Sequence, residues 1–103
     1  MTVSTEKTDG LCRMRIEGDM TVFSAADLKK DLLDILNECS ELEMDLSQVN
    51  EIDTSGLQLL ILAGRESAVL NKGFRIISYS PAIMSVLELF NMKEYFQAEG
   101  YGQ

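Results

Sequence analysis

Residues 51–57, Glu-Ile-Asp-Thr-Ser-Gly-Leu, decide the fold, because three short polar residues and a glycine interrupt apolar sequence where a helix has to begin. Before them, residues 42–46 favour a short strand, which a polar turn over residues 47–50 follows. After them, five residues fall on one side at helical spacing: Leu57, Leu60, Ile61, Gly64 and Ala68. Asn71-Lys72-Gly73 then supplies a helix stop. The sequence therefore predicts a strand, an exposed junction and a long helix.

The junction allows two interpretations. A helix N-terminus offers free backbone N–H groups and a positive dipole end, so it tolerates Asp53 or a phosphate on Thr54 or Ser55. Gly56 lets another backbone approach closely. The simpler interpretation is that one of the three polar side chains only caps the helix. Spacing alone leaves both interpretations open.

The start of the chain predicts an antiparallel hairpin. Its second strand, Leu11 to Glu17, has outward and inward side chains in alternation: Leu11, Arg13 and Arg15 against Cys12, Met14 and Ile16. Residues Val3 to Thr8 can pair with that strand across Asp9-Gly10, and a turn at Gly18-Asp19 follows. We expect Cys12 to be a buried structural thiol.

Two more amphipathic helices are expected. The first starts at Ser24, whose hydroxyl can form a capping box with Asp27, and runs to about Glu38. The second starts at Ser80-Pro81, where an N-cap residue is followed by proline at the first helical position. Residues 92–96 pack as a last short element.

The order of these elements predicts an α/β fold. Residues 74–79 form a strand after the long helix, so strands and single helices alternate once the hairpin has ended. Such connections give parallel pairing with right-handed crossovers. We predict a single domain over residues 1–103, with a mixed sheet of about four or five strands and helices packed against it.

Composition argues against several functions. Lys and Arg total 9 against 17 Asp and Glu, a net charge of −8, so nucleic acid is not an expected partner. The chain has no histidine and 2 cysteines, so we expect no metal site, no cofactor and no histidine-based triad. Residues 1–10 lack an export signal and the longest apolar stretch, residues 59–63, is too short for a bilayer, so we expect a cytoplasmic protein without membrane insertion.

The Asp-Thr-Ser-Gly sequence also invites comparison with the Asp-Thr-Gly of aspartic proteases. Those enzymes need two paired carboxylates that share one proton, and this chain has one copy, with Ser55 inserted before the glycine. It has no glycine-rich phosphate-binding loop and no histidine to activate Ser55. We therefore expect a binding protein and not an enzyme.

With its strand, Asp-Thr-Ser-Gly-Leu motif and helix in this order, the chain resembles the STAS family, whose small members include bacterial anti-sigma factor antagonists. The resemblance covers roughly residues 3–96. Apart from the motif, it rests on Gly18-Asp19 and Thr21, on residues 24–28 at a helix start, and on Ser80-Pro81.

The resemblance implies a binding switch. In the antagonist branch, the serine before the motif glycine, here Ser55, is phosphorylated by an anti-sigma factor that is also a kinase of the histidine-kinase ATPase type. The unphosphorylated antagonist binds that kinase, phosphorylation breaks the complex, and a serine phosphatase restores it. Thr54 is a second candidate acceptor. The expected partner-binding residues are Asp19, Thr21, Asp53, Thr54, Gly56, Gln58, Leu59 and Leu62.

The sequence leaves three questions open. Four apolar residues lie away from the main face of the long helix, and they indicate either a docking patch or a helix covered by its neighbours: Leu59, Leu62, Val69 and Leu70. The family also includes STAS subunits of transporters for lipids or anions and of chemotaxis-type signalling complexes, which are the alternative function. A homodimer is left open as well.

Overall fold

The computed structural model describes residues 1–97, so the last six residues of the predicted domain, 98–103, lie outside the described part. The described elements follow one another as β1 (Thr2–Thr8), β2 (Leu11–Met20), α1 (Ala25–Leu36), β3 (Glu41–Ile52), α2 (Thr54–Val69), β4 (Gly73–Tyr79), α3 (Pro81–Leu89) and α4 (Lys93–Gln97). The strands form a four-stranded sheet in the order β1-β2-β3-β4.

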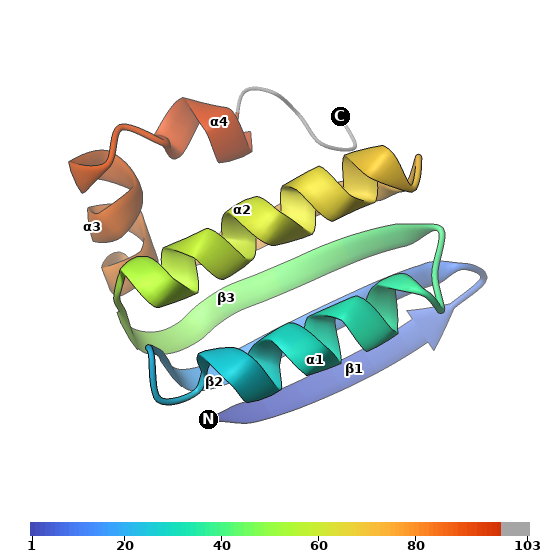
Figure 1. Cartoon of the computed structure of the whole chain (residues 1–103), viewed down its shortest axis with the longest axis horizontal. Coiled ribbons are helices and arrows are strands. Elements are labelled where there is room, and N and C mark those ends of the chain that lie inside the picture. Colours follow the sequence, from blue (N-terminus) through green and yellow to red (C-terminus); the bar gives the residue numbers. More distant parts are fainter. Residues whose placement is uncertain (98–103) are drawn as a thin grey trace.

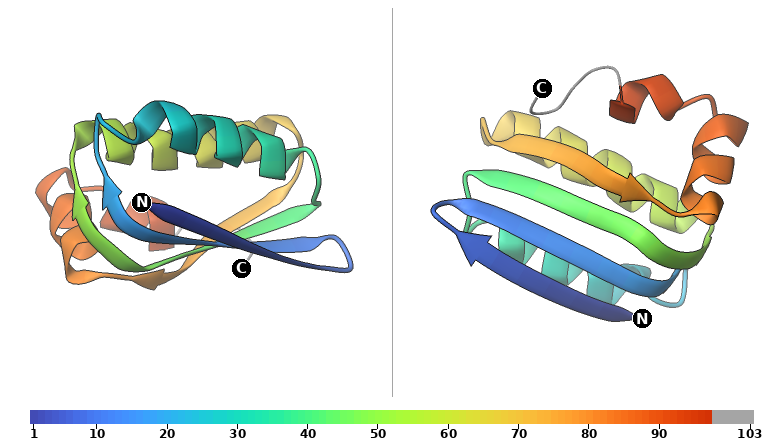
Figure 2. Two further views of the ribbon diagram at one scale, coloured as in Figure 1. Left: turned by 90° about the horizontal axis from the view of Figure 1, so that it is seen from below. Right: turned by 180° about the vertical axis from the view of Figure 1, so that it is seen from behind.

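The sheet is mixed, and α1 and α2 cover one of its faces (Figures 1 and 2). Strands β1 and β2 pair antiparallel as a hairpin, whereas β2 with β3 and β3 with β4 pair parallel across the helical connections. Helix α3 follows at the carboxyl end of β4, and α4 lies beyond the β4 edge (Figure 2). The α/β prediction is therefore confirmed, with the hairpin first and the alternating helices and strands after it.

The core lies between the sheet and its two covering helices. On β2 the inward residues Cys12, Met14 and Ile16 are buried, as their alternation predicts, and α1 contributes Leu28, Leu32, Ile35 and Leu36. Both cysteines are buried free thiols. Burial, and then the neighbouring Cys12 thiol, raise the pKa of Cys39 to about 12, so this thiol stays protonated at neutral pH.

The predicted turn at Gly18-Asp19 is wrong. Strand β2 continues through these residues to Met20, and the chain turns only afterwards, before α1. Its pairing with β3 shifts register after Arg15 and again after Gly18, which has φ of +104°. Such β-bulges bend a strand without ending it, and glycine takes the positive φ without strain, so its presence does not mark a turn here.

The predicted polar turn over residues 47–50 is also wrong, because β3 runs unbroken to Ile52. In this segment Gln48 pairs with Glu17 and Val49 with Gly18 of β2. Val49 is buried while Gln48 and Asn50 are exposed. The polar residues thus occupy the uncovered side of a long strand, where side chains can face water.

Helix α1 is shorter than predicted, since it ends at Leu36 and not near Glu38. The amides of Asn37 and Glu38 donate to the carbonyls of Asp34 and Ile35, which lie three residues back. This tighter pattern closes the helix end before the chain enters β3.

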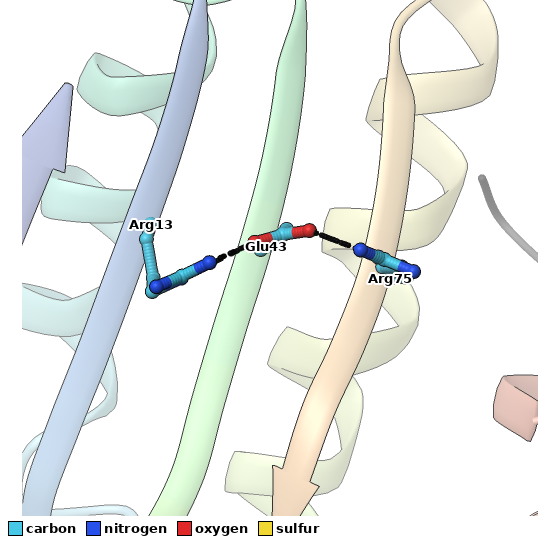
Figure 3. Close-up of polar contacts among 3 residues, drawn as sticks. All are labelled: Arg13, Glu43 and Arg75. Carbon is cyan, nitrogen blue, oxygen red and sulfur yellow. Dashed lines mark hydrogen bonds and ion pairs between the residues drawn. The ribbon is translucent and has the colours of Figure 1, made fainter. Parts of the chain in front are cut away.

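A charged row crosses the sheet on the face opposite α1 and α2 (Figure 3). The Glu43 carboxylate on β3 accepts from Nη2 of Arg13 at 2.9 Å and from the guanidinium of Arg75, including Nε at 3.0 Å. The Glu43 side chain is 8% exposed and each arginine about 50% exposed. The arginine stems shield the carboxylate, while their charged groups stay in contact with water. The hydrogen bonds from Arg75, and then those from Arg13, lower the pKa of Glu43.

Replacing Glu43 by Gln is expected to destabilise the fold by about 1 kcal/mol at pH 7, because the charge-assisted hydrogen bonds from the two guanidinium groups become weaker ones. A carboxylate whose folded pKa is lowered stabilises the protein above its ordinary pKa of about 4.3 and loses this effect as pH falls toward the folded value. The difference in urea midpoint between wild type and Glu43→Gln should therefore shrink below about pH 4. An equal difference at pH 7 and pH 3 would contradict this origin.

Candidate functional site

Asp53 organises the site at the N-terminus of α2. Its Oδ1 accepts from the backbone N–H groups of Ser55 at 2.8 Å and Gly56 at 3.2 Å, so Asp53 is the N-cap of the helix. Its Oδ2 accepts from the N–H of Val22 at 3.0 Å. One carboxylate therefore joins the start of α2 to the loop between β2 and α1, which is 31 residues away in the sequence.

The loop between β2 and α1, residues 21–24, is held by Ser24. Its hydroxyl donates to the carbonyl of Asp19 at 2.8 Å and accepts from the N–H of Thr21 at 3.1 Å, while its own N–H donates to the Thr21 carbonyl at 3.0 Å. Ser24 is the N-cap residue of α1, but its side chain makes no capping hydrogen bond to the helix, so the predicted capping box with Asp27 is wrong. Because the Ser24 hydroxyl is bonded to Asp19 and Thr21, it stabilises the loop and is not available to cap the helix.

The electrostatics of the site centre on Asp53. The hydrogen bond from the N–H of Val22, followed by those from Gly56 and Ser55, keeps the pKa of Asp53 below its ordinary value. The carboxylate is therefore ionised at neutral pH, and it sits at the positive end of the α2 dipole.

Removing the Asp53 carboxylate should loosen the loop and the helix start together. In Asp53→Ala, the N–H groups of Val22, Ser55 and Gly56 lose their acceptor, and their hydrogen exchange should accelerate about fivefold. Exchange measured by NMR tests this, with Asp45→Ala as the control, because Asp45 Oδ1 accepts from Ser47 N–H elsewhere in the sheet. If the Val22 amide is unaffected in Asp53→Ala, the two segments are not coupled through this carboxylate.

A shallow cavity of about 310 Å³ lies between α1 and α2, next to Asp53. We call it the Ser55 groove, and its lining comprises Ala25, Ala26 and Lys29 from α1 and Ser55, Gln58, Leu59 and Leu62 from α2. The wall combines four apolar side chains with one hydroxyl, one amide and one ammonium group. Within residues 1–97, Lys29 makes no ion pair, so its charge is available at this surface.

The structure brings most of the expected site residues together. Ser55 is half-buried in the groove with Gln58, Leu59 and Leu62, whereas Thr54 is exposed and does not line the groove. Asp19 lies at the end of β2 and Thr21 in the adjoining loop, and both contribute mainly through main-chain atoms bonded to Ser24. Gly56 is buried, and its role is close packing against β2.

The second apolar side of α2 is partly covered and partly free. Near the helix start, Leu59 is 7% exposed and Leu62 is half-buried, because α1 packs beside α2 there. At the other end Val69 is 77% exposed. Ala68, expected on the inner face, is exposed too. Covering by α1 therefore accounts for Leu59 and Leu62, whereas it does not account for the exposed Val69.

Sequence reasoning missed Val22, Phe23 and Lys29. Val22 and Phe23 are 62% and 97% exposed on the loop beside Asp53, and Lys29 lies on the groove wall. An apolar pair directly before the Ser24 helix start was the available signal, since loops at such places are usually polar. The long-range bond from Val22 to Asp53 has no local sequence signature.

A comparison with protein families identifies this arrangement. A family profile described as "Mlab, STAS domain" matches residues 3–97. The chain belongs to the STAS domain family. The strand, motif and helix that carry the resemblance are thus β3, the Asp53 junction and α2 of this STAS domain.

Solved structures share the fold. An anti-sigma factor antagonist from Mycobacterium paratuberculosis is 21% identical, with 93% of this chain and 82% of that chain covered and a TM-score of 0.79. The phosphorylated form of the Bacillus cell fate determinant SpoIIAA is 14% identical, with 88% and 85% covered and a TM-score of 0.71. A variant of RsbS from Moorella thermoacetica is 23% identical, with 86% and 77% covered and a TM-score of 0.70.

Two further features bear on the class of site. Within residues 1–97, Cys, Asp and Glu side chains form no group of three that could hold a metal ion. None of the helices in this part of the chain combines the length and the apolar character that crossing a bilayer requires.

Proposed function

We propose that this STAS domain is an anti-sigma factor antagonist whose binding to a serine kinase is controlled by phosphorylation of Ser55. The unphosphorylated domain binds an anti-sigma factor kinase of the histidine-kinase ATPase type in the cytoplasm and so releases the sigma factor. Phosphorylation separates the pair, and a serine phosphatase resets the domain. The domain acts by binding and is not itself an enzyme.

The observation that carries this proposal is the position of Ser55. Its hydroxyl-bearing side chain lines a groove with both apolar and polar walls at a helix N-terminus, one residue from the exposed Thr54 and beside the Asp53 carboxylate. A surface of this composition suits protein contact, and a phosphate added there changes the charge of the contact itself. The names of the structural neighbours, which include an antagonist and a phosphorylated determinant, agree with this proposal.

The chemical step requires only what the kinase brings. The γ-phosphorus of ATP forms a bond to Oγ of Ser55 and its bond to the β–γ bridging oxygen breaks, so ADP leaves. The hydroxyl proton passes to a base of the kinase. The positive dipole end of α2 tolerates the new dianion, so the product domain stays folded.

Phosphosite mapping tests the proposal. Purified wild type and Ser55→Ala are incubated with ATP and each serine kinase of this ATPase type encoded in the same genome, and phosphopeptides are identified by mass spectrometry. Phosphate on Ser55 that is lost in Ser55→Ala, in a domain that binds the kinase when unmodified, supports the switch. Phosphate on Thr54 instead would move the acceptor, and no phosphate with any kinase would contradict the proposal.

A stable subunit of a transporter for lipids or anions, or of a chemotaxis-type complex, is the second candidate. The family profile supports this second candidate, because the description of the profile names Mlab and not an antagonist. In this case the same groove binds its partner permanently. Affinity purification of the tagged domain should then recover a permease, ATPase or chemotaxis protein equally from wild type and Ser55→Ala.

A further inference from the structure

The loop between β2 and α1 presents two apolar side chains to solvent on a fixed backbone. Phe23 is 97% exposed and Val22 is 62% exposed. Their loop is nevertheless closed by the Ser24 hydroxyl bonds at 2.8 and 3.1 Å, by the Ser24 N–H bond to the Thr21 carbonyl and by the Val22 N–H bond to Asp53. The exposure therefore belongs to an ordered turn and not to a free loop tip.

Such a turn has the properties of an interaction anchor. An aromatic side chain loses little conformational entropy when it is buried, and a backbone that is already fixed lowers the cost of binding further. Binding energy at protein interfaces concentrates in a few such side chains that fill a pocket on the partner. A fully exposed phenylalanine makes no comparable contribution to its own fold.

The turn is continuous with the Ser55 groove. Ala25 and Ala26, which begin α1 directly after the turn, line that groove together with Ser55. On the other side, the Val22 amide is bonded to the carboxylate that caps α2. A partner that fills the groove therefore meets Phe23 at its edge.

Charge indicates the kind of partner. Exposed carboxylates surround the turn: Asp19 and Glu51 are paired neighbours at the ends of β2 and β3, and Asp27 lies in the first turn of α1. The chain as a whole has a net charge of −8. A complementary surface has an apolar pocket with a rim of Lys and Arg, and an anionic bilayer would be repelled.

We propose that Phe23, supported by Val22, is the anchor by which this domain docks into an apolar pocket with a basic rim on its serine kinase. The inference rests on the proposed function and adds the residue that determines affinity for the partner. The Ser55 groove then controls the complex through phosphate, while Phe23 holds it.

The test compares Phe23→Ser with Leu89→Ser. Leu89 is 77% exposed at the end of α3, so its variant removes a similar apolar side chain outside the Ser55 groove. Binding to the kinases that phosphorylate Ser55 is measured by surface plasmon resonance. We expect Phe23→Ser to raise Kd about 30-fold or more, which is the size of an interface hot spot, while Leu89→Ser and both melting temperatures stay near wild type. The wild-type association rate should fall about tenfold from 50 to 500 mM NaCl.

Each other outcome overturns a definite statement. If wild type binds the kinase and Phe23→Ser binds equally well, Phe23 is not the docking anchor, while the proposed function stands. If wild type binds no serine kinase, the proposed function fails and the anchor with it. If sedimentation shows wild type to be a dimer that Phe23→Ser dissociates, the occupant is a second copy and not the kinase.

Discussion

A phosphate on Ser55 is expected to weaken the complex with the serine kinase about 100-fold or more, without unfolding the domain. The phosphate adds a charge of roughly −1.5 to −2. It enters a groove whose neighbouring carboxylate, Asp53, is already ionised, because its lowered pKa keeps it so at neutral pH. In a complex, both charges lose water together, so repulsion and desolvation act in the same direction.

Ser55→Glu carries part of this charge and should show part of the effect. Its control is Thr8→Glu, which adds one negative charge at the hairpin end of the sheet, opposite to the end where β2 leads into the site. Isothermal titration calorimetry gives Kd for the phosphorylated domain and for both variants, and circular dichroism gives their melting temperatures. The expected order of weakening is phosphorylated domain, then Ser55→Glu, with Thr8→Glu close to wild type. Equal Kd values for Thr8→Glu and Ser55→Glu would reduce the effect to total charge and contradict a local switch.

The helix starts were predictable because their signals are local. At Ser80 the structure has the predicted cap, and at the junction it selects Asp53 from the three candidate caps, Asp53, Thr54 and Ser55. At Ser24 a short polar side chain failed to cap, since its hydroxyl bonds to Asp19 at the end of β2 and to Thr21 in the loop that follows. Local rules cannot decide between two acceptable partners when tertiary packing fixes the choice.

The strand ends were less predictable for a different reason. Polar residues in β3 such as Gln48 and Asn50 indicate a turn when only the sequence is considered, yet they are exposed residues of a continuous strand on either side of the buried Val49. Parallel strands usually have both faces covered and therefore a continuous apolar sequence. Here the charged row of Arg13, Glu43 and Arg75 lies on the second face instead, and this arrangement is visible only once the register is known.

The candidate site also has one part that local sequence predicts and one part that depends on the fold. Ser55, Gln58, Leu59 and Leu62 follow one motif and one helix, so the sequence alone places them together. The contribution of Phe23 depends on a hydrogen bond between segments that are 31 residues apart, and no spacing in the sequence encodes it. Local motifs can thus locate the modified residue, whereas the surface around it requires the fold.

Gly56→Ala is expected to destabilise the domain by about 3 kcal/mol or more, although alanine is the better helix former by about 1 kcal/mol. A Cβ built on Gly56 would lie closer than 3.0 Å to the main-chain oxygen of Met20 and 2.8 Å from Cγ1 of Ile52. The Met20 oxygen cannot move freely, because it also accepts from the N–H of Asp53 at 3.2 Å. The start of α2 would therefore have to shift away from β2, and it would carry Ser55 with it.

Gly73→Ala is the matched control, since the three atoms nearest to its added Cβ all belong to the exposed side chain of Glu41, with Cγ 3.1 Å away, and not to the backbone. Urea unfolding of wild type and both variants should give a large loss of stability for Gly56→Ala and a small change for Gly73→Ala. Where Gly56→Ala is too unstable to purify, its recovery on addition of an osmolyte distinguishes destabilisation from failed expression. A Gly56→Ala protein as stable as wild type would show that α2 does not need this close approach to β2. The motif glycine would then serve the partner and not the fold.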